Sequence, residues 1–463
     1  MSLDTLSARL AAHVIDTPWD ALPPAAVLAA KHMALDTLAV AWAGTSAPGI
    51  PSVRETIVDE GGKPHSTVWA THAKIPARSA AFLNSAAAAA LDFDGMRASE
   101  RGSVHSDSVV LPAALAVAEQ HGATGRELVA ALVLGNDIVT RLGAASALPH
   151  RGWYQTAIYG ILGAAAAAAR LMKLDAEQAM HALGIAVNQA CSTQLPNIER
   201  SLVKRYSSAF AAQGGVLSAL LASRGVTAAR QAIEGRSGFY DLYQPGEPDR
   251  LLDGLGVSYP HVETGIKRFP SCACNHTAIE AALQLAREHP VHASEITELD
   301  VTISPYVHRL VGAPFDPSTD PQVAAQFSVQ YSVAAALLRR RFGVGDIEPE
   351  AVLDPATLAL ARRVAVHVDE TWGNSRAATV TVRTHAGGRR ERHVAHIPGS
   401  REAPLSEADR GDKALDCLRA GACPLDAAQA QRLVERVLGL DELADAGELL
   451  KGLGPVHAGS PSA

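Results

Sequence analysis

Residues 77–91 read ARSAAFLNSAAAAAL, and this stretch decides the fold class of the 463-residue chain. Alanine has the highest helix propensity and its small side chain lets neighbouring backbones approach, so the stretch predicts a helix packed against other helices. The whole chain has this character, since 48% of its residues are hydrophobic but only 5% are aromatic. Apolar residues three and four positions apart predict further helices over residues 25–42, 109–121, 125–142 and 159–174. Thr124 with Glu127, and Asp175 with Gln178, have the spacing of helix N-terminal caps.

The helical spacing of apolar residues gives way to runs of β-branched residues near residue 265 and returns near residue 398. Between these points, β-branched residues predict strands over 296–304, 364–368, 378–383 and 392–397, the last two joined by the turn Ala386-Gly387-Gly388. Helical spacing predicts helices over 275–288 and 321–341 in this region, and over 405–417, 426–438 and 441–450 after it. We therefore predict a mainly α protein. A large all-helical domain (1–265 and 398–453) carries an inserted smaller α+β domain (266–397), and a disordered Gly-, Pro- and Ser-rich tail follows (454–463).

Charge and composition argue against several classes of function. A net charge of −7, without a Lys- and Arg-rich run, disfavours nucleic acid as a partner but leaves a small anionic substrate open. The most apolar stretch, residues 160–172, is too short to span a membrane and contains Arg170, and no secretory signal begins the chain. Five scattered cysteines suit a reducing compartment, and the spacing of Cys272 and Cys274 does not suit a metal. We expect a cytoplasmic protein without a metal site.

Two stretches of the helical region carry polar groups in apolar surroundings. Asp92 and Asp94 follow residues 77–91, and His105 comes a short loop later, which fits either an acid/base set or a helix end with an Asp-Gly turn. Trp153 and Tyr154 precede the helix over 159–174, where aromatic residues more often pack than react. The residues alone leave both interpretations open.

Two further stretches carry cations. Lys204 and Arg205 lie just before a predicted helix, where the helix dipole disfavours positive charge, so a bound carboxylate or a solvated surface pair would each explain them. Lys267 and Arg268 lie at the predicted seam between the domains, with His276 opening the next helix. Spacing does not decide whether Lys267 faces solvent or a cleft, although such seams are favoured places for small-molecule sites.

Short motifs over nearly the whole chain decide between these interpretations. They are Thr67-Val68-Trp69, Ala80-Ala81-Phe82-Leu83-Asn84, Leu91-Asp92-Phe93-Asp94, residues 111–119 (LPAALAVAE), Leu183-Gly184-Ile185-Ala186, Glu234-Gly235 with Gly238-Phe239, Lys267 with Phe269-Pro270-Ser271-Cys272 and His276, Phe327-Ser328 with Tyr331, and Pro398-Gly399 before Pro404-Leu405-Ser406. In this order the chain resembles the MmgE/PrpD family, which includes 2-methylcitrate dehydratases, cis-aconitate decarboxylases and iminodisuccinate epimerases.

The resemblance implies a helical domain, an inserted α+β lid, a homodimer and a cofactor-free site between the domains. Position by position, it implies that Asp92 and His105 form an acid/base pair and that Lys204 and Lys267 bind and stabilise substrate carboxylates. A wider set of positions is expected to touch the substrate: Met96, Arg205, Arg268, His276 and Tyr331.

The chain departs from the family pattern at positions that the resemblance places in the pocket. Met96 stands where the family has a threonine, and Tyr154 where it has a histidine. Ser207-Ser208-Ala209 replaces His-Pro-Gly, and Ala273 replaces an arginine. These changes leave the fold assignment intact but not the substrate assignment. Tyr154 either donates a proton in place of the histidine or reshapes the pocket.

The chemistry shared by the family is proton abstraction next to a carboxylate, with the developing charge held by lysines. We expect a hydro-lyase that dehydrates a small hydroxylated di- or tricarboxylate. An epimerase or other isomerase of a dicarboxylate is the alternative, because it needs no leaving group. A decarboxylase and a non-catalytic carboxylate-binding homologue are the less favoured alternatives.

Overall fold

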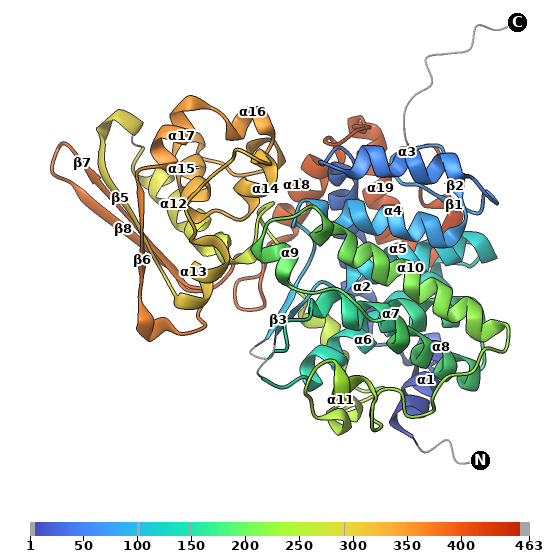
Figure 1. The fold of residues 1–463 in the computed structure, drawn as a ribbon. Coiled ribbons are helices and arrows are strands. Elements are labelled where there is room, and N and C mark those ends of the chain that lie inside the picture. The colour runs from blue at the N-terminus through green and yellow to red at the C-terminus, as the bar shows by residue number, and fades with distance from the viewer. Residues whose placement is uncertain (1–4, 100–101, 149, 291, 454–463) are drawn as a thin grey trace, which may run out of the picture.

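The computed structural model describes residues 5–99, 102–148, 150–290 and 292–453, so the predicted disordered tail lies outside the described residues. The fold is mainly α with a smaller α+β part, as predicted. Figure 1 shows the two parts side by side, with the strands of the α+β part on the side away from the helical body. Helices α14, α15, α16 and α17 of the α+β part lie on the side of the sheet toward that body.

The helical body is built first from eleven helices and two short hairpins. The helices are α1 (Leu6–Asp16), α2 (Pro24–Gly44), α3 (Ile50–Glu60), α4 (Ala77–Ala90), α5 (Asp107–His121), α6 (Gly125–Ala145), α7 (Gln155–Leu171), α8 (Ala176–Gln189), α9 (Leu195–Ile198), α10 (Val203–Ser223) and α11 (Phe239–Leu242). The hairpins pair β1 (Ser66–Thr67) with β2 (Lys74–Ile75), and β3 (Arg97–Ser99) with β4 (Gly102–Val104). The caps predicted for α6 and α8 are confirmed, because Thr124–Glu127 and Asp175–Gln178 both form capping boxes.

Helix α7 lies at the centre of this body, in contact with α5, α6, α8 and α10. Small residues allow these close approaches: a Cβ atom added to Gly163 would lie 2.7 Å from the carbonyl oxygen of Gly135 in α6. One added to Gly215 in α10 would lie 2.7 Å from the backbone nitrogen of Ala165. Two core helices, α2 and α6, are long and apolar enough to cross a membrane by length and composition. In this fold, 67% and 89% of those apolar stretches are buried against other helices.

The α+β part contains one four-stranded sheet and six helices. Its strands are β5 (Ile296–Ile303), β6 (Val364–Val368), β7 (Ala378–Thr384) and β8 (Arg389–Val394), in the order β6-β5-β7-β8, with only β5 and β6 parallel. Its helices are α12 (His276–Glu288), α13 (Pro305–Val311), α14 (Pro321–Gln326), α15 (Val329–Arg339), α16 (Pro349–Val352) and α17 (Pro355–Ala361). Helices α12 and α15 cover the sheet. Strand β8 begins and ends earlier than predicted, because the turn closes tightly through Gly388 accepting from the Thr384 amide (3.1 Å).

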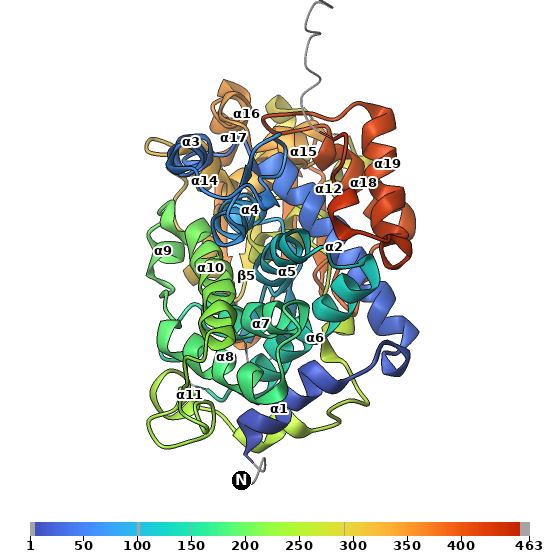
Figure 2. The ribbon, with the colours of Figure 1, turned by 90° about the vertical axis from the view of Figure 1, so that its right-hand side faces the viewer.

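After residue 398 the chain returns to the helical body. Helices α18 (Glu407–Leu418) and α19 (Ala427–Leu438) pack against α2, as Figure 2 shows at the upper right. The two segments that connect the parts touch each other, since a Cβ atom added to Gly399 would lie 1.8 Å from the carbonyl oxygen of Ile266. The return of the chain therefore brings α18 next to the seam.

Two helix predictions are wrong in detail. The helix predicted over 321–341 is two helices, because the Gln326 carbonyl leaves the helical ladder to accept from Ser271 Oγ (2.9 Å), the Cys272 amide (3.0 Å) and Asn275 Nδ2 (3.2 Å). The helix predicted over 441–450 consists of two 3-10 turns, Leu440–Glu442 and Ala446–Glu448. There the Asp445 carboxylate accepts from the Gly447 amide (2.8 Å), a local bond that competes with helix formation.

We predict that Gly163→Ala lowers the free energy of unfolding by about 2 kcal/mol, because the new methyl overpacks the α6–α7 contact. Besides the Gly135 carbonyl, it would lie 2.3 Å from Val139 Cγ2. Gly411→Ala in α18 is the matched control, since its methyl meets nothing within 4 Å and should raise stability by about 0.5–1 kcal/mol. Thermal melting monitored by circular dichroism measures both. Equal melting temperatures for the two variants would contradict the close-packing argument.

Candidate functional site

The candidate site begins at the end of α4, where the chain turns sharply. Asp92 follows the C-cap residue Leu91 with a backbone φ of +50°, the left-handed conformation that usually ends helices at glycine. Aspartate is one of the few other residues that tolerate this conformation, because its short side chain bonds locally. The turn leaves helix carbonyls without helical partners and points the Asp92 carboxylate into the protein.

Lys204 and Lys267 converge on Asp92. Lys204, in the first turn of α10, pairs through its ammonium with Asp92 Oδ1. Lys267, in the segment that leads into the α+β part, donates to the Asp92 carbonyl (2.6 Å) and lies 3.4 Å from Asp92 Oδ2. Both ammonium groups are largely buried, with 12% and 3% of the side chains exposed. The structure therefore brings together two cations that lie 63 positions apart in the sequence.

Burial and charge act in opposite directions on these groups. Burial disfavours the charged form of Asp92, but Lys204, Lys267 and His105 outweigh it and hold the pKa of the carboxyl well below its usual range. Burial likewise disfavours the Lys204 ammonium, yet Asp92 and Tyr154 raise the pKa of Lys204 above its usual value. Both groups therefore remain ionised at neutral pH. The Asp92 carboxylate also offsets the unfavourable position of Lys204 at a helix N-terminus.

A second carboxylate, Asp94, orients His105. The His105 Nδ1 atom lies 3.2 Å from Asp94 Oδ2, and the His105 amide donates to Thr156 Oγ1 (3.1 Å) at the start of α7. Burial opposes ionisation of Asp94, but His105 outweighs it and lowers the pKa of Asp94 to about 2. Asp94, and not Asp92 as expected from the sequence, is therefore the carboxylate that lies against the ring of His105 and orients it.

Tyr154 lies at the N-cap of α7, buried beside this cluster. Burial raises the pKa of its hydroxyl, and Asp94 and Asp92 act in the same direction while Lys204 opposes them. The hydroxyl is therefore protonated at neutral pH and can act as a proton donor. His276, at the start of α12, is fully buried, and burial and Lys267 lower its pKa to about 3, so its ring is neutral. Its Nε2 lies 3.3 Å from the Ser271 carbonyl, and its Nδ1 has no hydrogen-bond partner.

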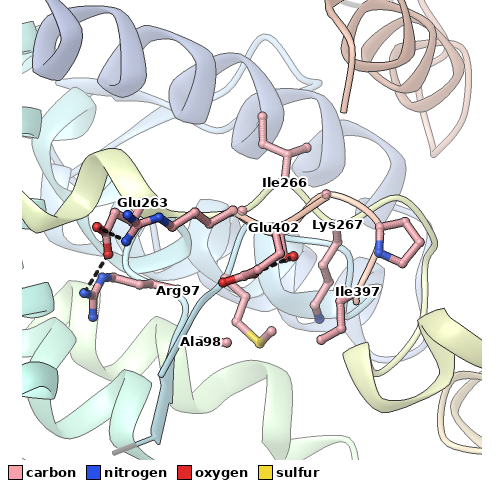
Figure 3. A pocket seen from close by; sticks show the side chains of 13 residues that line it. Arg97, Ala98, Glu263, Ile266, Lys267, Ile397 and Glu402 are labelled. Carbon is pink, nitrogen blue, oxygen red and sulfur yellow. Dashed lines mark hydrogen bonds and ion pairs between the residues drawn. The ribbon is translucent and has the colours of Figure 1, made fainter. Parts of the chain in front are cut away.

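A cavity of about 180 Å³ opens beside Lys267. Met96 lines it, held by a backbone pair with Gly265 (2.8 and 3.0 Å), and Ile397 and Gly399 line the opposite side. Figure 3 shows the Lys267 side chain extending from the linker past Ile397. At the outer end, Glu263 bridges Arg97 (3.1 Å) and Arg401 (2.6 Å). The described lining residues do not include Asp92, His105 or Lys204, so Lys267 separates the cavity from the rest of the cluster.

Three of the expected substrate-binding residues have other partners, although Arg205 also lines a small pocket together with Lys204. Arg205 donates to the Pro48 carbonyl (2.6 Å), and Arg268 faces Asp409 of α18 (3.5 Å). The Tyr331 hydroxyl bonds the Asp346 carbonyl inside the α+β part. Each side chain has a local structural partner that one-dimensional motif matching cannot reveal.

The sequence analysis missed three side chains that hold the Asp92 turn. Gln326 donates to the Ala90 carbonyl (3.3 Å), Lys413 donates to the Phe93 carbonyl (3.0 Å), and Lys413 also pairs with Asp36 (2.6 Å). One signal was available: Asp36 is the only acidic residue in α2 and lies in its mostly apolar second half, which predicts a buried cation partner. Among the described residues, no group of three or more His, Cys, Asp or Glu side chains is arranged to hold a metal ion.

The chain is similar to known proteins over most of its length. The MmgE/PrpD N-terminal domain model matches residues 8–251, and the MmgE/PrpD C-terminal domain model matches residues 269–440. A cis-aconitate decarboxylase-like protein of Aspergillus oryzae is 27% identical, over 96% of each chain. A cis-aconitate decarboxylase of Aspergillus terreus is 28% identical, over 93% of this chain and 92% of its own. One of Mus musculus is 27% identical, over 72% of this chain and 70% of its own.

The lowered pKa of Asp94 gives a pH prediction. A carboxylate whose folded pKa is about 2, below the usual 3.8, contributes stability at higher pH and loses it as pH falls toward 2. We expect the melting temperature of the wild type to fall more steeply between about pH 5 and about pH 3 than that of Asp94→Asn. The control is Asp59→Asn on the exposed side of α3, which should follow the wild type. Parallel curves for wild type and Asp94→Asn would refute the Asp94–His105 pairing.

Proposed function

The chain belongs to the MmgE/PrpD family, and from that membership we propose that it is a lyase that acts on a small di- or tricarboxylate through a carbanion next to a carboxylate. The observation that carries the proposal is the convergence of Lys204 and Lys267 on Asp92 beside the His105–Asp94 pair. Buried cations that are preorganised before the reaction stabilise a developing negative charge strongly. An oriented imidazole beside them supplies or removes the proton.

Decarboxylation of an unsaturated tricarboxylate is the first reaction to test, because the relatives named above are cis-aconitate decarboxylases or resemble them. In this reaction the bond between a carbon and its carboxylate breaks and carbon dioxide leaves. The electron pair stays on the carbon, delocalised toward the neighbouring double bond and carboxylate, where Lys204 and Lys267 stabilise it. The imidazolium of His105 then gives its proton to the carbon, with Asp94 holding the ring.

Dehydration of a hydroxylated acid is the second candidate, and Tyr154 is the observation that favours it. Here the imidazole of His105 takes the proton from the carbon next to the carboxylate, and the bond from the neighbouring carbon to its hydroxyl breaks. The leaving hydroxyl needs a proton to depart as water. Tyr154, buried beside Lys204 with a raised pKa, is suited to give it.

The test is turnover of candidate acids in deuterated water, followed by proton and carbon NMR. The acids are cis-aconitate, citrate, 2-methylcitrate and a chiral dicarboxylate with an exchangeable α-hydrogen. We expect carbon dioxide and one deuteron incorporated per product molecule from an unsaturated tricarboxylate. A new alkene formed from a hydroxy acid would establish dehydration, and exchange without elimination would establish an epimerase. No exchange and no product from any acid would refute a lyase and leave a carboxylate-binding homologue.

Removing either ammonium group tests the cationic cluster itself. We predict that Lys204→Met and Lys267→Met each lower kcat/KM by at least about a hundredfold, or about 2.7 kcal/mol. Methionine keeps much of the side-chain volume, and Asp92 retains the other lysine in each variant, so the melting temperature should change little. His105→Asn should lower kcat while leaving substrate binding mostly intact, since its proposed task is proton transfer.

Lys173→Met, which removes a surface lysine with 78% of its side chain exposed, is the control and should match the wild type in kcat and KM. Steady-state kinetics on the acid identified by NMR measures all four variants. If Lys204→Met and Lys267→Met keep near-normal kcat/KM, the cluster is not the site of the reaction.

A further inference from the structure

A third buried lysine, Lys413 of α18, holds the peptide between Asp92 and Asp94. Its ammonium donates to the Phe93 carbonyl (3.0 Å) and lies 3.9 Å from the centre of the Phe93 ring, a cation–π contact. Phe93 is the residue between the two carboxylates of the candidate site. Lys413 lies 320 positions away from it in the sequence, in the segment that returns to the helical body.

The charge of Lys413 is balanced by Asp36 from the middle of α2. Asp36 Oδ1 lies 2.6 Å from the Lys413 ammonium, and only 5% of either side chain is exposed. The second oxygen, Asp36 Oδ2, has no hydrogen-bond partner. A buried pair of this kind usually contributes little net stability, because desolvation offsets the attraction. Its presence in a core of alanine and leucine therefore points to a role other than stability.

The surroundings of the Asp92 turn indicate what that role is. Gln326, Lys267 and Lys413 donate to the carbonyls of Ala90, Asp92 and Phe93. Each donor comes from a different segment of the chain, and each satisfies a carbonyl in the last turn of α4 or in the turn that follows it. The carbonyl that Lys413 holds belongs to Phe93, the residue directly before Asp94, whose carboxylate lies beside His105.

We propose that Lys413, with Asp36 as its counter-ion, is a positioning residue that fixes Asp94, and through it His105, for proton transfer. This inference rests on the proposed function of the Asp92 cluster. Lys413 touches no reacting atom in this arrangement; it acts by holding one carbonyl and one ring. Loss of that hold lets the 92–94 backbone relax and turns Asp94 away from the imidazole, while Lys204 and Lys267 continue to bind carboxylates. Catalysis then suffers more than binding.

The chain offers a matched control for a purely structural pair. Lys31 lies in α2, one and a half turns before Asp36, pairs with Asp441 and donates to the Leu438 carbonyl (2.8 Å). Like Lys413, it joins α2 and the C-terminal segment through one carboxylate and one carbonyl. Unlike Lys413, it does not contact the Asp92 turn. Lys31→Met and Lys413→Met each remove an ion pair between α2 and the C-terminal segment, the Lys31–Asp441 pair being the more exposed (13% and 23% against 5% and 5%), and only Lys413→Met removes the hold on Phe93.

The test compares Lys413→Met, Lys31→Met and the double variant Asp36→Asn/Lys413→Met, with kinetics normalised to folded enzyme. We expect Lys413→Met to lower kcat by about thirtyfold or more, with KM within about threefold of the wild type. Lys31→Met should lower the melting temperature without changing kcat. The double variant removes both charges, so it should regain melting temperature but not kcat. Recovery of kcat with stability in the double variant would overturn the proposal, as would wild-type kcat in Lys413→Met.

Amide hydrogen exchange supplies a readout that needs no substrate. We expect exchange in peptides covering residues 91–96 to be faster by about tenfold or more in Lys413→Met and in the double variant, and unchanged in Lys31→Met. Unchanged exchange in Lys413→Met would also overturn the positioning role. If Lys204→Met and Lys267→Met abolish turnover while Lys413→Met does not, the proposed function stands and this inference fails. If no acid is turned over by the wild type, the proposed function fails and hydrogen exchange alone decides.

Discussion

The turn at Asp92 is the constraint on which the site depends. A helix of alanines can end anywhere, because no side chain in it prefers a particular neighbour. Here it ends in a left-handed aspartate whose carbonyl and carboxylate both meet Lys267, while Lys204 meets the carboxylate. These contacts join α4, α10 and the linker to the α+β part at one residue. Asp94 lies two residues beyond this turn, and its carboxylate pairs with His105.

The lysines of the cluster are already paired with carboxylates of the protein itself. Lys204 and Lys267 are balanced by Asp92 and Asp94, so no uncompensated charge is buried when the site is empty of anions. An incoming carboxylate must compete with Asp92 for the same ammonium groups. Because Lys267 comes from the linker between the two parts, its contacts are sensitive to how that linker lies. Gly399 of the return segment packs directly against Ile266 in this linker.

Much of the fold follows from the sequence, because local patterns decide it. The apolar spacing predicts helices such as α4 and α6 to within a few residues, and strand β6 agrees at both ends. The secondary-structure predictions fail where tertiary contacts override the local pattern. The helix over 321–341 breaks because Ser271, Cys272 and Asn275 capture the Gln326 carbonyl. The break in turn directs the Gln326 amide to Ala90, so the same contact that defeats the local pattern also supports the Asp92 turn.

The same distinction between local sequence pattern and tertiary contact applies to the residues of the candidate site. Residues carried by family motifs, such as Asp92, Lys204 and Lys267, are expected from the sequence and meet in space. Lys413 is not, since it lies in a polar helix where one more lysine carries no signal. Tyr331 shows the converse: it sits in a matching motif but bonds Asp346 instead.

The choice of reaction rests on residues outside the charged cluster. Decarboxylation and dehydration both pass through a carbanion, so two lysines and an oriented imidazole serve either reaction equally. What differs is the second proton, which a leaving hydroxyl needs and departing carbon dioxide does not. A thioether at position 96 cannot supply it, whereas the buried, protonated hydroxyl of Tyr154 can. Of the positions at which the chain departs from the family pattern, Met96 and Tyr154 are therefore the two that bear on this choice, while the role proposed for the lysines is common to both reactions.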